Sequence, residues 1–199
     1  MKRALCVVAA VALFACTQDI GPIGTTDGAL NVVRQAATAP ALFAARDSFY
    51  AKAGTATSFR MFYQGATPSD TGAELLLLEV PGDGLLRRPD GLIIRPGDSI
   101  LVTINVPDVT RFRFEVLPPG LLFNPNNPAR MRVSYANANK DFDNDGDQDQ
   151  VDNGIEEDLD LWYRAATGTL WFRQLAVKFE QADEIGLNVR AAAHYAVAW

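Results

Sequence analysis

Side chains that alternate between apolar and polar constrain the fold of this chain more than any other feature. Residues 100–106, 112–116 and 131–135 place Ile, Val, Phe, Met or Tyr at every second position, with mostly polar or charged residues between them. Successive side chains of a strand point to opposite faces, so this period buries one face and leaves the other in water. The pattern predicts antiparallel strands that are covered on one side.

Further strand-like segments lie on both sides of these three. Clusters of Pro, Gly, Asp and Thr separate many of them, as at residues 81–84, 88–91, 96–98, 118–120 and 166–168. Many short strands with turns about every ten residues predict an all-β, antiparallel β-sandwich, with at most a single helical turn near residues 153–159. The additional candidate strands are Phe59–Tyr63, Glu74–Val80, Leu159–Arg164, Thr169–Gln174, Ala176–Gln181, Ile185–Arg190 and His194–Trp199.

The first 15 residues have the features of a bacterial export signal. Lys2 and Arg3 form a positive region, and the apolar stretch Ala4–Ala15 that follows is too short to span a bilayer as a helix. Removal of residues 1–15 would leave 184 residues, enough for one substantial domain.

The end of this signal, residues 13–16 (LFAC), resembles the lipobox at which lipoprotein signals are cleaved before a cysteine that becomes acylated. Phe14 departs from that pattern, because a smaller residue usually stands there. The resemblance implies lipidation of Cys16 and anchoring to the bacterial cell envelope. Thr17, by resemblance to enterobacterial sorting rules, favours the outer membrane or cell surface. The alternative is ordinary secretion with an unmodified Cys16.

Residues 16–55 are predicted to be a flexible tether, because they are rich in Gly, Thr, Ala and Pro up to about Arg46. One or two helical turns are expected around Ala29–Ala37, and the alternative is that part of the segment packs on the domain. Cys6 leaves with the signal and Cys16 would carry lipid, so the mature chain has no disulfide. The β-sandwich domain is therefore predicted at residues 56–199, held by its own core.

The turn and core residues of residues 70–199 resemble those of a ZU5-type β-sandwich domain. The resemblance lies in Pro119-Gly120-Leu121 with Phe123, a strand that begins after Pro128, and the closing Tyr195-Ala196-Val197. It implies an interaction module, since ZU5 domains of animal scaffold proteins are not enzymes. Some members cleave themselves at His-Phe-Ser. Here His194-Tyr195-Ala196 offers no hydroxyl nucleophile at the third position, so self-cleavage by that route is not expected.

The stretch 141–152 (DFDNDGDQDQVD) has the ligand spacing of a twelve-residue calcium loop, with Gly146 at the sixth position. It is similar to thrombospondin type-3 repeats and dockerins. An EF-hand proper is not expected, because a strand rather than a helix precedes the loop. A solvated acidic loop without a specific ion is the alternative, although acidity alone does not require the glycine. The predicted calcium ligands are Asp141, Asp143, Asp145, Asp147 (through its carbonyl), Asp149 and Asp152.

The negative charge of the chain is local. Without residues 1–15 it has 16 basic and 24 acidic residues, a net charge of −8. Residues 141–160 contain ten of the acids and no Lys or Arg, so the rest of the chain sums to +2. No concentrated basic face is indicated, so nucleic acid is not an expected partner.

Catalytic patterns are weak in this sequence. Its only histidine, His194, lies in an apolar strand and is expected to be structural, and no Gly-x-Ser-x-Gly turn surrounds any serine. Zinc catalysis would need several His or Cys ligands, and these are missing from a sequence with one His and two Cys. A small hydrolase with paired carboxylates is the least favoured alternative, because most acids lie in the loop region.

Trp162 and Trp171 lie on neighbouring candidate strands, where side-chain alternation would direct both away from the core. Two exposed tryptophans would form a platform for sugar rings or a protein partner, but the favoured interpretation is that they cover each other or cap the edge of the sandwich. The sequence therefore predicts an exported, lipid-anchored, calcium-binding β-sandwich that acts as a non-catalytic envelope module with an unidentified protein or glycan partner. A calcium-dependent carbohydrate-binding or adhesive domain is the alternative.

Overall fold

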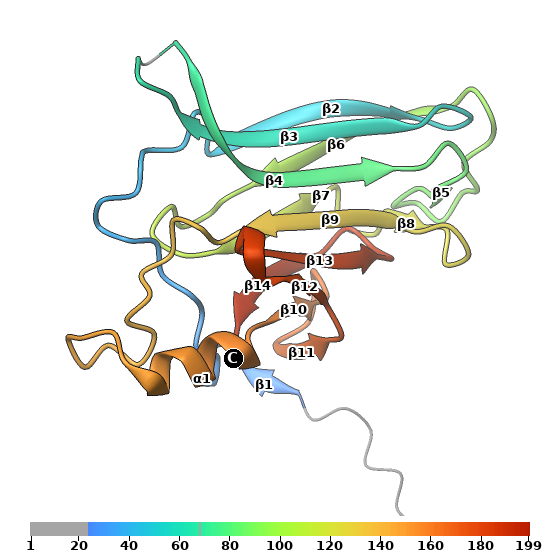
Figure 1. Ribbon diagram of the computed structural model, residues 1–199. Helices are drawn as coiled ribbons and strands as arrows, with labels where there is room; N and C mark the ends of the chain where they lie inside the picture. The colour runs from blue at the N-terminus through green and yellow to red at the C-terminus, as the bar shows by residue number, and fades with distance from the viewer. Residues whose placement is uncertain (1–23, 68) are drawn as a thin grey trace, which may run out of the picture.

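The computed structural model describes residues 24–67 and 69–199, and these residues form two antiparallel sheets packed face to face (Figure 1). The prediction of an all-β sandwich is confirmed. The larger sheet has seven strands, in the spatial order β1 (Thr25–Thr26), β11 (Leu170–Gln174), β10 (Asp160–Arg164), β14 (His194–Ala198), β7 (Arg113–Leu117), β6 (Ser99–Asn105) and β2 (Arg46–Lys52).

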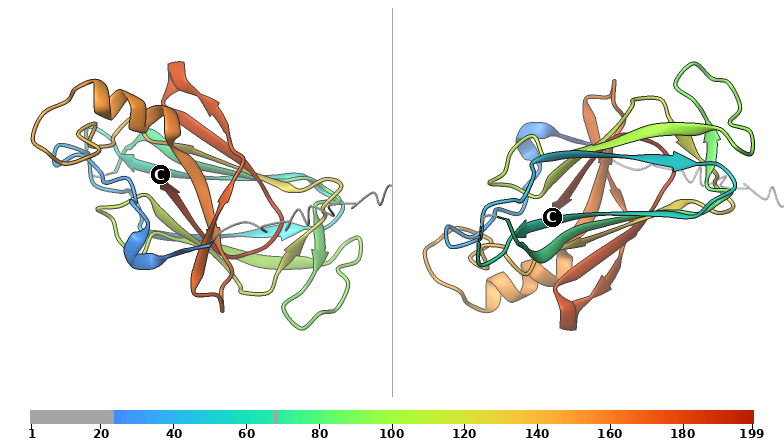
Figure 2. Two further views of the ribbon diagram at one scale, coloured as in Figure 1. Left: turned by 90° about the horizontal axis from the view of Figure 1, so that it is seen from below. Right: turned by 90° about the horizontal axis from the view of Figure 1, so that it is seen from above.

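The second sheet lies across the core from the first, and Figure 2 shows β2 and β6 in one layer with β3 (Thr57–Gln64) and β4 (Thr71–Val80) in the other. Two short strands, β5 (Leu85–Arg87) and β8 (Leu122–Phe123), pair separately. The second sheet has five strands, in the spatial order β12 (Val177–Phe179), β13 (Glu184–Val189), β9 (Ala129–Ser134), β4 and β3.

The alternating residues face the space between the sheets. Val102 and Ile104 of β6, Phe114 of β7, and Met131 and Val133 of β9 are all buried in one continuous core. The intervening residues are mostly half-buried or exposed, so the period of two in the sequence corresponds to the two faces of each strand. Tyr195 of β14 donates its hydroxyl hydrogen to the carbonyl of Ala191, at 2.6 Å, which satisfies a polar group that the core would otherwise isolate.

The tether prediction for residues 16–55 is wrong from residue 24 onward. The segment before β2 runs along the larger sheet, where Val32 bridges Ala198 and the amide of Val33 donates to the carbonyl of Val197. Val33 belongs to the main core and β2 pairs with β6 over its whole length. The domain therefore begins before residue 56. The predicted signal peptide, residues 1–15, and Cys16 lie outside the described residues.

The N-terminal segment is held because it covers an apolar outer face of the larger sheet. Leu30 and Val32 form a small buried cluster with Trp171 and the two small residues Ala196 and Ala198. Small side chains on β14 leave room for the crossing backbone, and burial of Leu30 and Val32 removes apolar area from water. The predicted helical turns around Ala29–Ala37 reduce to a 3-10 turn, η1 (Asp27–Ala29).

Candidate metal centre

The acidic loop leaves the sandwich after β9 and returns through a helix, α1 (Gln150–Asp158), to β10. In Figure 1 it projects beyond the end of the sheets, close to the C-terminus. Phe142 fixes its start, because this ring is buried and meets Trp199 edge to face with 5.9 Å between centroids. The amide of Asn139 donates to the carbonyl of Arg34, which ties the same region to the N-terminal segment. The loop is thus anchored at its base.

Three of the predicted ligands converge at the tip of the loop. One carboxylate oxygen from each of Asp141, Asp143 and Asp145 lies within 4.8 Å of the other two. Calcium binds oxygens at about 2.4 Å, so two ligands of one ion are separated by at most about 4.8 Å. The spacing of the three carboxylates therefore fits a single hard cation.

Backbone amides hold these carboxylates in place. The amide of Asp145 donates to Oδ1 of Asp141 at 3.1 Å and to Oδ1 of Asp143 at 3.2 Å. The amide of Gly146 donates to Oδ2 of Asp141 at 3.2 Å. Gly146 has a φ of +107°, a conformation that residues with a side chain rarely adopt, so the sixth position turns the chain as the loop pattern predicts.

Asp152 joins the two ends of the loop. Its buried carboxylate accepts from the amide of Phe142 at 2.6 Å through Oδ1 and from that of Asp149 at 3.0 Å through Oδ2. A longer bond to the amide of Asp143, at 3.3 Å, adds to these. The hydrogen bonds from Asp149, Phe142 and Asp143 lower the pKa of Asp152 below its ordinary value, because they favour the ionised form. Asp152 is thus ionised and fixed at neutral pH.

Asp149 and Asp152 also form the capping box that starts α1. The Asp149 side chain accepts from the amides of Val151 and Asp152, and Asp152 accepts in return from the amide of Asp149. The helix covers nine residues, more than the single turn predicted near Asn153–Leu159. Neither residue belongs to the convergent group of three, so the structure gives them a role that the ligand spacing did not suggest. The signal was available as two acids three residues apart before a helical stretch.

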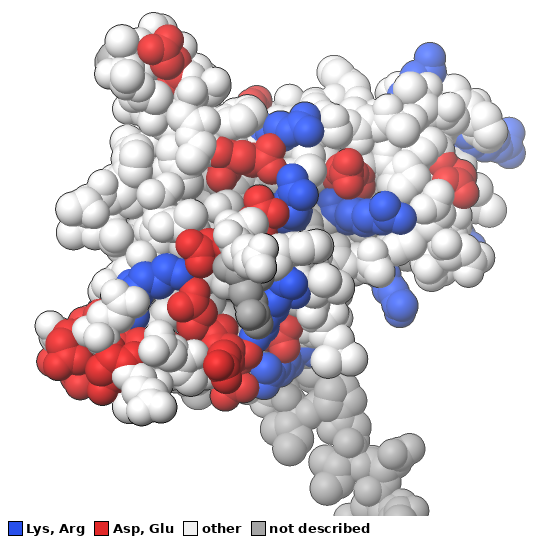
Figure 3. All heavy atoms as spheres, in the orientation of Figure 1, with Lys and Arg blue, Asp and Glu red and all other residues white. Residues whose placement is uncertain are grey.

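Repulsion among the carboxylates, together with partial desolvation, raises pKa values in the loop. The pKa of Asp147 is raised above 3.8, mainly by the negative charge of Asp145, and partial desolvation together with its acidic neighbours raises the pKa of Asp143. Figure 3 shows the acidic side chains gathered over the loop and α1, at the lower left of the molecule. A cation bound among these groups would relieve the repulsion.

Two basic side chains border the loop without entering the convergent group. Lys140 lies 2.5 Å from Oε1 of Glu156 and 3.0 Å from Oδ1 of Asp183, so it links α1 to the turn before β13. Arg34 donates to the side-chain oxygen of Asn144 at 2.7 Å. These contacts hold the walls of the loop and leave the carboxylates of Asp141, Asp143 and Asp145 for a metal.

Trp162 and Trp171 do not form the open aromatic platform, which was the less favoured interpretation of their positions. Both side chains do point away from the main core, but Trp171 is only 1% exposed in a cluster with Leu30 and Val32, and the half-buried Trp162 packs against the same cluster. The indole nitrogen of Trp171 donates to Asp27 at 2.9 Å, and that of Trp162 donates to the carbonyl of Ala198 at 3.1 Å. The segment predicted to be a tether occupies the surface on which a sugar ring would have stacked.

His194 lies on the same outer face. Its Nδ1 is 3.5 Å from Oε1 of Glu115. Desolvation and the nearby Arg164 guanidinium lower its pKa, so the imidazole is neutral at neutral pH. The chain contains no second histidine, and none of the residues that the structure describes is a cysteine.

Searches of the chain against protein-family models, curated proteins and solved structures find no match. Within residues 24–67 and 69–199, no helix is long and apolar enough to cross a membrane. The ZU5 resemblance stays a prediction that rests on the turn and core residues quoted above.

Proposed function

We propose that this protein is an exported, lipid-anchored β-sandwich that binds calcium through residues 141–152 and acts as a non-catalytic binding or structural module of the cell envelope. The convergence of the Asp141, Asp143 and Asp145 carboxylates within 4.8 Å supports the metal site most directly. The carbonyl of Asp147 and the carboxylates of Asp149 and Asp152 are the further ligands that the spacing proposes. Magnesium is disfavoured, because it retains water and requires stricter octahedral geometry.

Calcium in this loop would act as a structural clip. Asp152 ties the start of the loop to the start of α1, and Phe142 ties the loop to the core. A cation that fixes the loop tip would therefore also fix the connection between β9 and β10. No disulfide is expected in the mature chain, so metal binding would add stability that the core must otherwise supply. A calcium ion that binds only the folded state stabilises that state by about 2.7 kcal/mol when the calcium concentration is a hundredfold above the dissociation constant.

Export and anchoring at Cys16 are supported by the signal-like start and the lipobox-like LFAC. Gly24, the first residue that the structure describes, is eight residues after Cys16. Eight residues span at most about 27 Å when fully extended. A lipid on Cys16 would thus hold the sandwich close to the membrane surface, rather than at the end of the long tether that the sequence predicts.

Thermal unfolding of the full chain tests the metal site. Calcium should raise the midpoint relative to chelator, and the double variant Asp141→Ala with Asp145→Ala should abolish the gain. Glu157→Gln is the matched control, because Glu157 is exposed and lies in the same acidic region outside the loop. This control should keep the full calcium response. An identical midpoint in calcium and chelator would defeat the proposal.

A further inference from the structure

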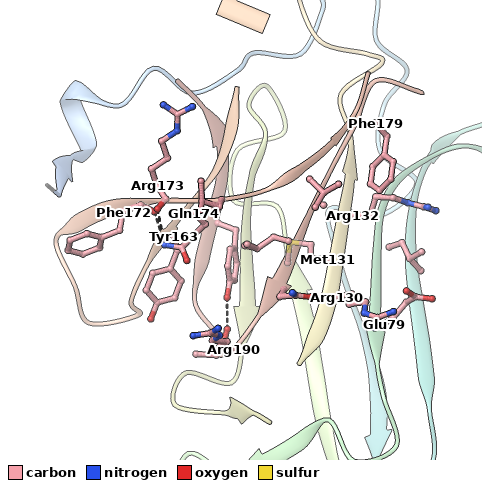
Figure 4. Close-up of a pocket in the computed structure, with 18 residues that line it drawn as sticks. Glu79, Arg130, Met131, Arg132, Tyr163, Phe172, Arg173, Gln174, Phe179 and Arg190 are labelled. Carbon is pink, nitrogen blue, oxygen red and sulfur yellow. Dashed lines mark hydrogen bonds between the residues drawn. The ribbon is translucent and has the colours of Figure 1, made fainter. Parts of the chain in front are cut away.

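A groove of about 920 Å³ opens where the two sheets separate at one side of the sandwich. Figure 4 shows Tyr163, Phe172 and Gln174 on one side of this groove and Phe179, Arg132 and Glu79 on the other. The first three residues belong to β10 and β11, and the others to β12, β9 and β4. The groove is therefore open between the edge of one sheet and the outer face of the other.

The floor of the groove contains an unpaired length of strand. β12 pairs only with Glu184–Gly186 of β13, because the chain arrives from β11 through Leu175 and Ala176 and begins β12 opposite Gly186. The rest of β13, Leu187–Val189, pairs with β9 on one side and has no strand on the other among the residues that the structure describes. Leu187 and Asn188 line the groove. Free backbone groups at such an edge can pair with an added strand.

The charge on the walls is mainly positive. Four arginines and one glutamate line the groove. Arg132 and Arg173 are already paired, with Glu184 at 3.2 Å and Asp160 at 2.6 Å. Arg130 and Arg190 are exposed and have no ion pair among the described residues.

Apolar side chains complete the walls. Leu175 is 97% exposed, Val177 61% and Phe179 47%, and all three border the groove. Apolar side chains that lie together on a protein surface are usually covered by a binding partner. An exposed apolar group beside a free strand edge is therefore typical of an interaction site.

We propose that this groove binds an extended peptide segment of a partner protein, in which apolar and acidic side chains alternate, as an added strand beside Leu187–Val189. Such a strand would direct alternate side chains to opposite faces. One face meets the apolar wall of Tyr163, Phe172 and Leu187, and the other meets the arginines. A lipid chain would leave the free backbone groups of β13 without hydrogen-bond partners, so an extended peptide fits this surface better.

This inference adds a partner to the proposed envelope module and does not depend on the metal site. A library of random twelve-residue peptides, displayed on messenger RNA, is selected on the full chain carrying Cys16→Ser, with calcium present throughout. The test variant combines Arg130→Glu with Arg190→Glu. The control combines Arg46→Glu with Arg95→Glu, which changes the charge equally at exposed arginines outside the groove. Thermal midpoints establish that both variants fold.

The expected result is enrichment of peptides with Asp or Glu at alternate positions between apolar residues. Their affinity should fall about tenfold or more in the Arg130/Arg190 variant and stay within about twofold in the control. Hydrogen exchange at residues 187–189 should slow when a selected peptide binds.

Three outcomes would overturn the inference: no enrichment, enrichment without alternation, or equal binding to both variants. Vesicles of phosphatidylglycerol form a separate arm. Binding to them that is lost in the Arg130/Arg190 variant, without peptide enrichment, would assign the groove to lipid headgroups instead. Because calcium is present in every arm, none of these outcomes bears on the calcium titration.

Discussion

Leu30→Ala should destabilise the domain, and its effect measures how firmly the N-terminal segment is held. Leu30 is 5% exposed and packs with Val32 against Trp171. Leucine-to-alanine changes in fully enclosed cores cost about 2–5 kcal/mol. This cluster is small and lies on the outer face of the sheet, so we expect the lower part of that range, about 2–3 kcal/mol. For a domain of this size the thermal midpoint should fall by about 4–12 °C.

Urea denaturation of the full chain in excess calcium, followed by tryptophan fluorescence, provides the measurement. Leu175→Ala is the matched control, because Leu175 is 97% exposed. It should change the free energy of unfolding by less than about 0.5 kcal/mol. A similarly small effect for Leu30→Ala would refute the packing of this segment and restore the flexible tether.

Three further predictions concern the loop. Asp152→Asn should lower the thermal midpoint even in chelator, because the amides of Phe142 and Asp149 lose a charged acceptor. Gly146→Ala should weaken calcium binding measured by titration, since a φ of +107° strains a residue with a side chain. The calcium-induced rise in midpoint should fade as pH falls toward about 4, because the raised pKa of Asp143 lets this ligand take up a proton first, and the raised pKa of Asp147 lets a neighbouring negative charge that attracts the cation be neutralised. The stabilisation that Asp152 itself gives should persist to lower pH, because its pKa is depressed and its contribution is lost only as pH falls through that value. Scanning calorimetry across pH in calcium and in chelator checks both effects. A calcium response that is constant down to pH 3 would contradict the first, and loss of the Asp152 stabilisation in chelator at or above pH 4 would contradict the second.

The strands of the sandwich could be predicted because their pattern is local. Val102, Ile104, Met131 and Val133 bury one face of their strands in the structure, as the period of two requires. The order of the strands carries no comparable signal. Neighbours such as β14 and β7 are far apart in the sequence, and their pairing depends on the whole topology.

The N-terminal segment was misjudged because its burial depends on a distant surface. Leu30, Val32 and Val33 are few and stand among small and polar residues, so their local composition indicates a linker. They are buried because Trp171, Ala196 and Ala198 present an apolar face for them to cover. The same contact explains why two tryptophans directed away from the core are not exposed.

The loop, too, could be predicted from the sequence only in part. The convergence of Asp141, Asp143 and Asp145 follows from alternating acids and a glycine turn, so spacing alone predicts it. The positions of Asp149 and Asp152 depend on where α1 starts, and the capping box uses both carboxylates. Because only a single helical turn was predicted, and later in the chain, the capping role of Asp149 and Asp152 was not expected.

Calorimetric titration of the full chain with calcium tests the central claim most directly. The account predicts one calcium ion per chain, normal binding in Glu157→Gln, and loss of binding when Asp141→Ala is combined with Asp145→Ala. No heat of binding in the unmodified chain would contradict it, and so would a titration that the double variant leaves unchanged.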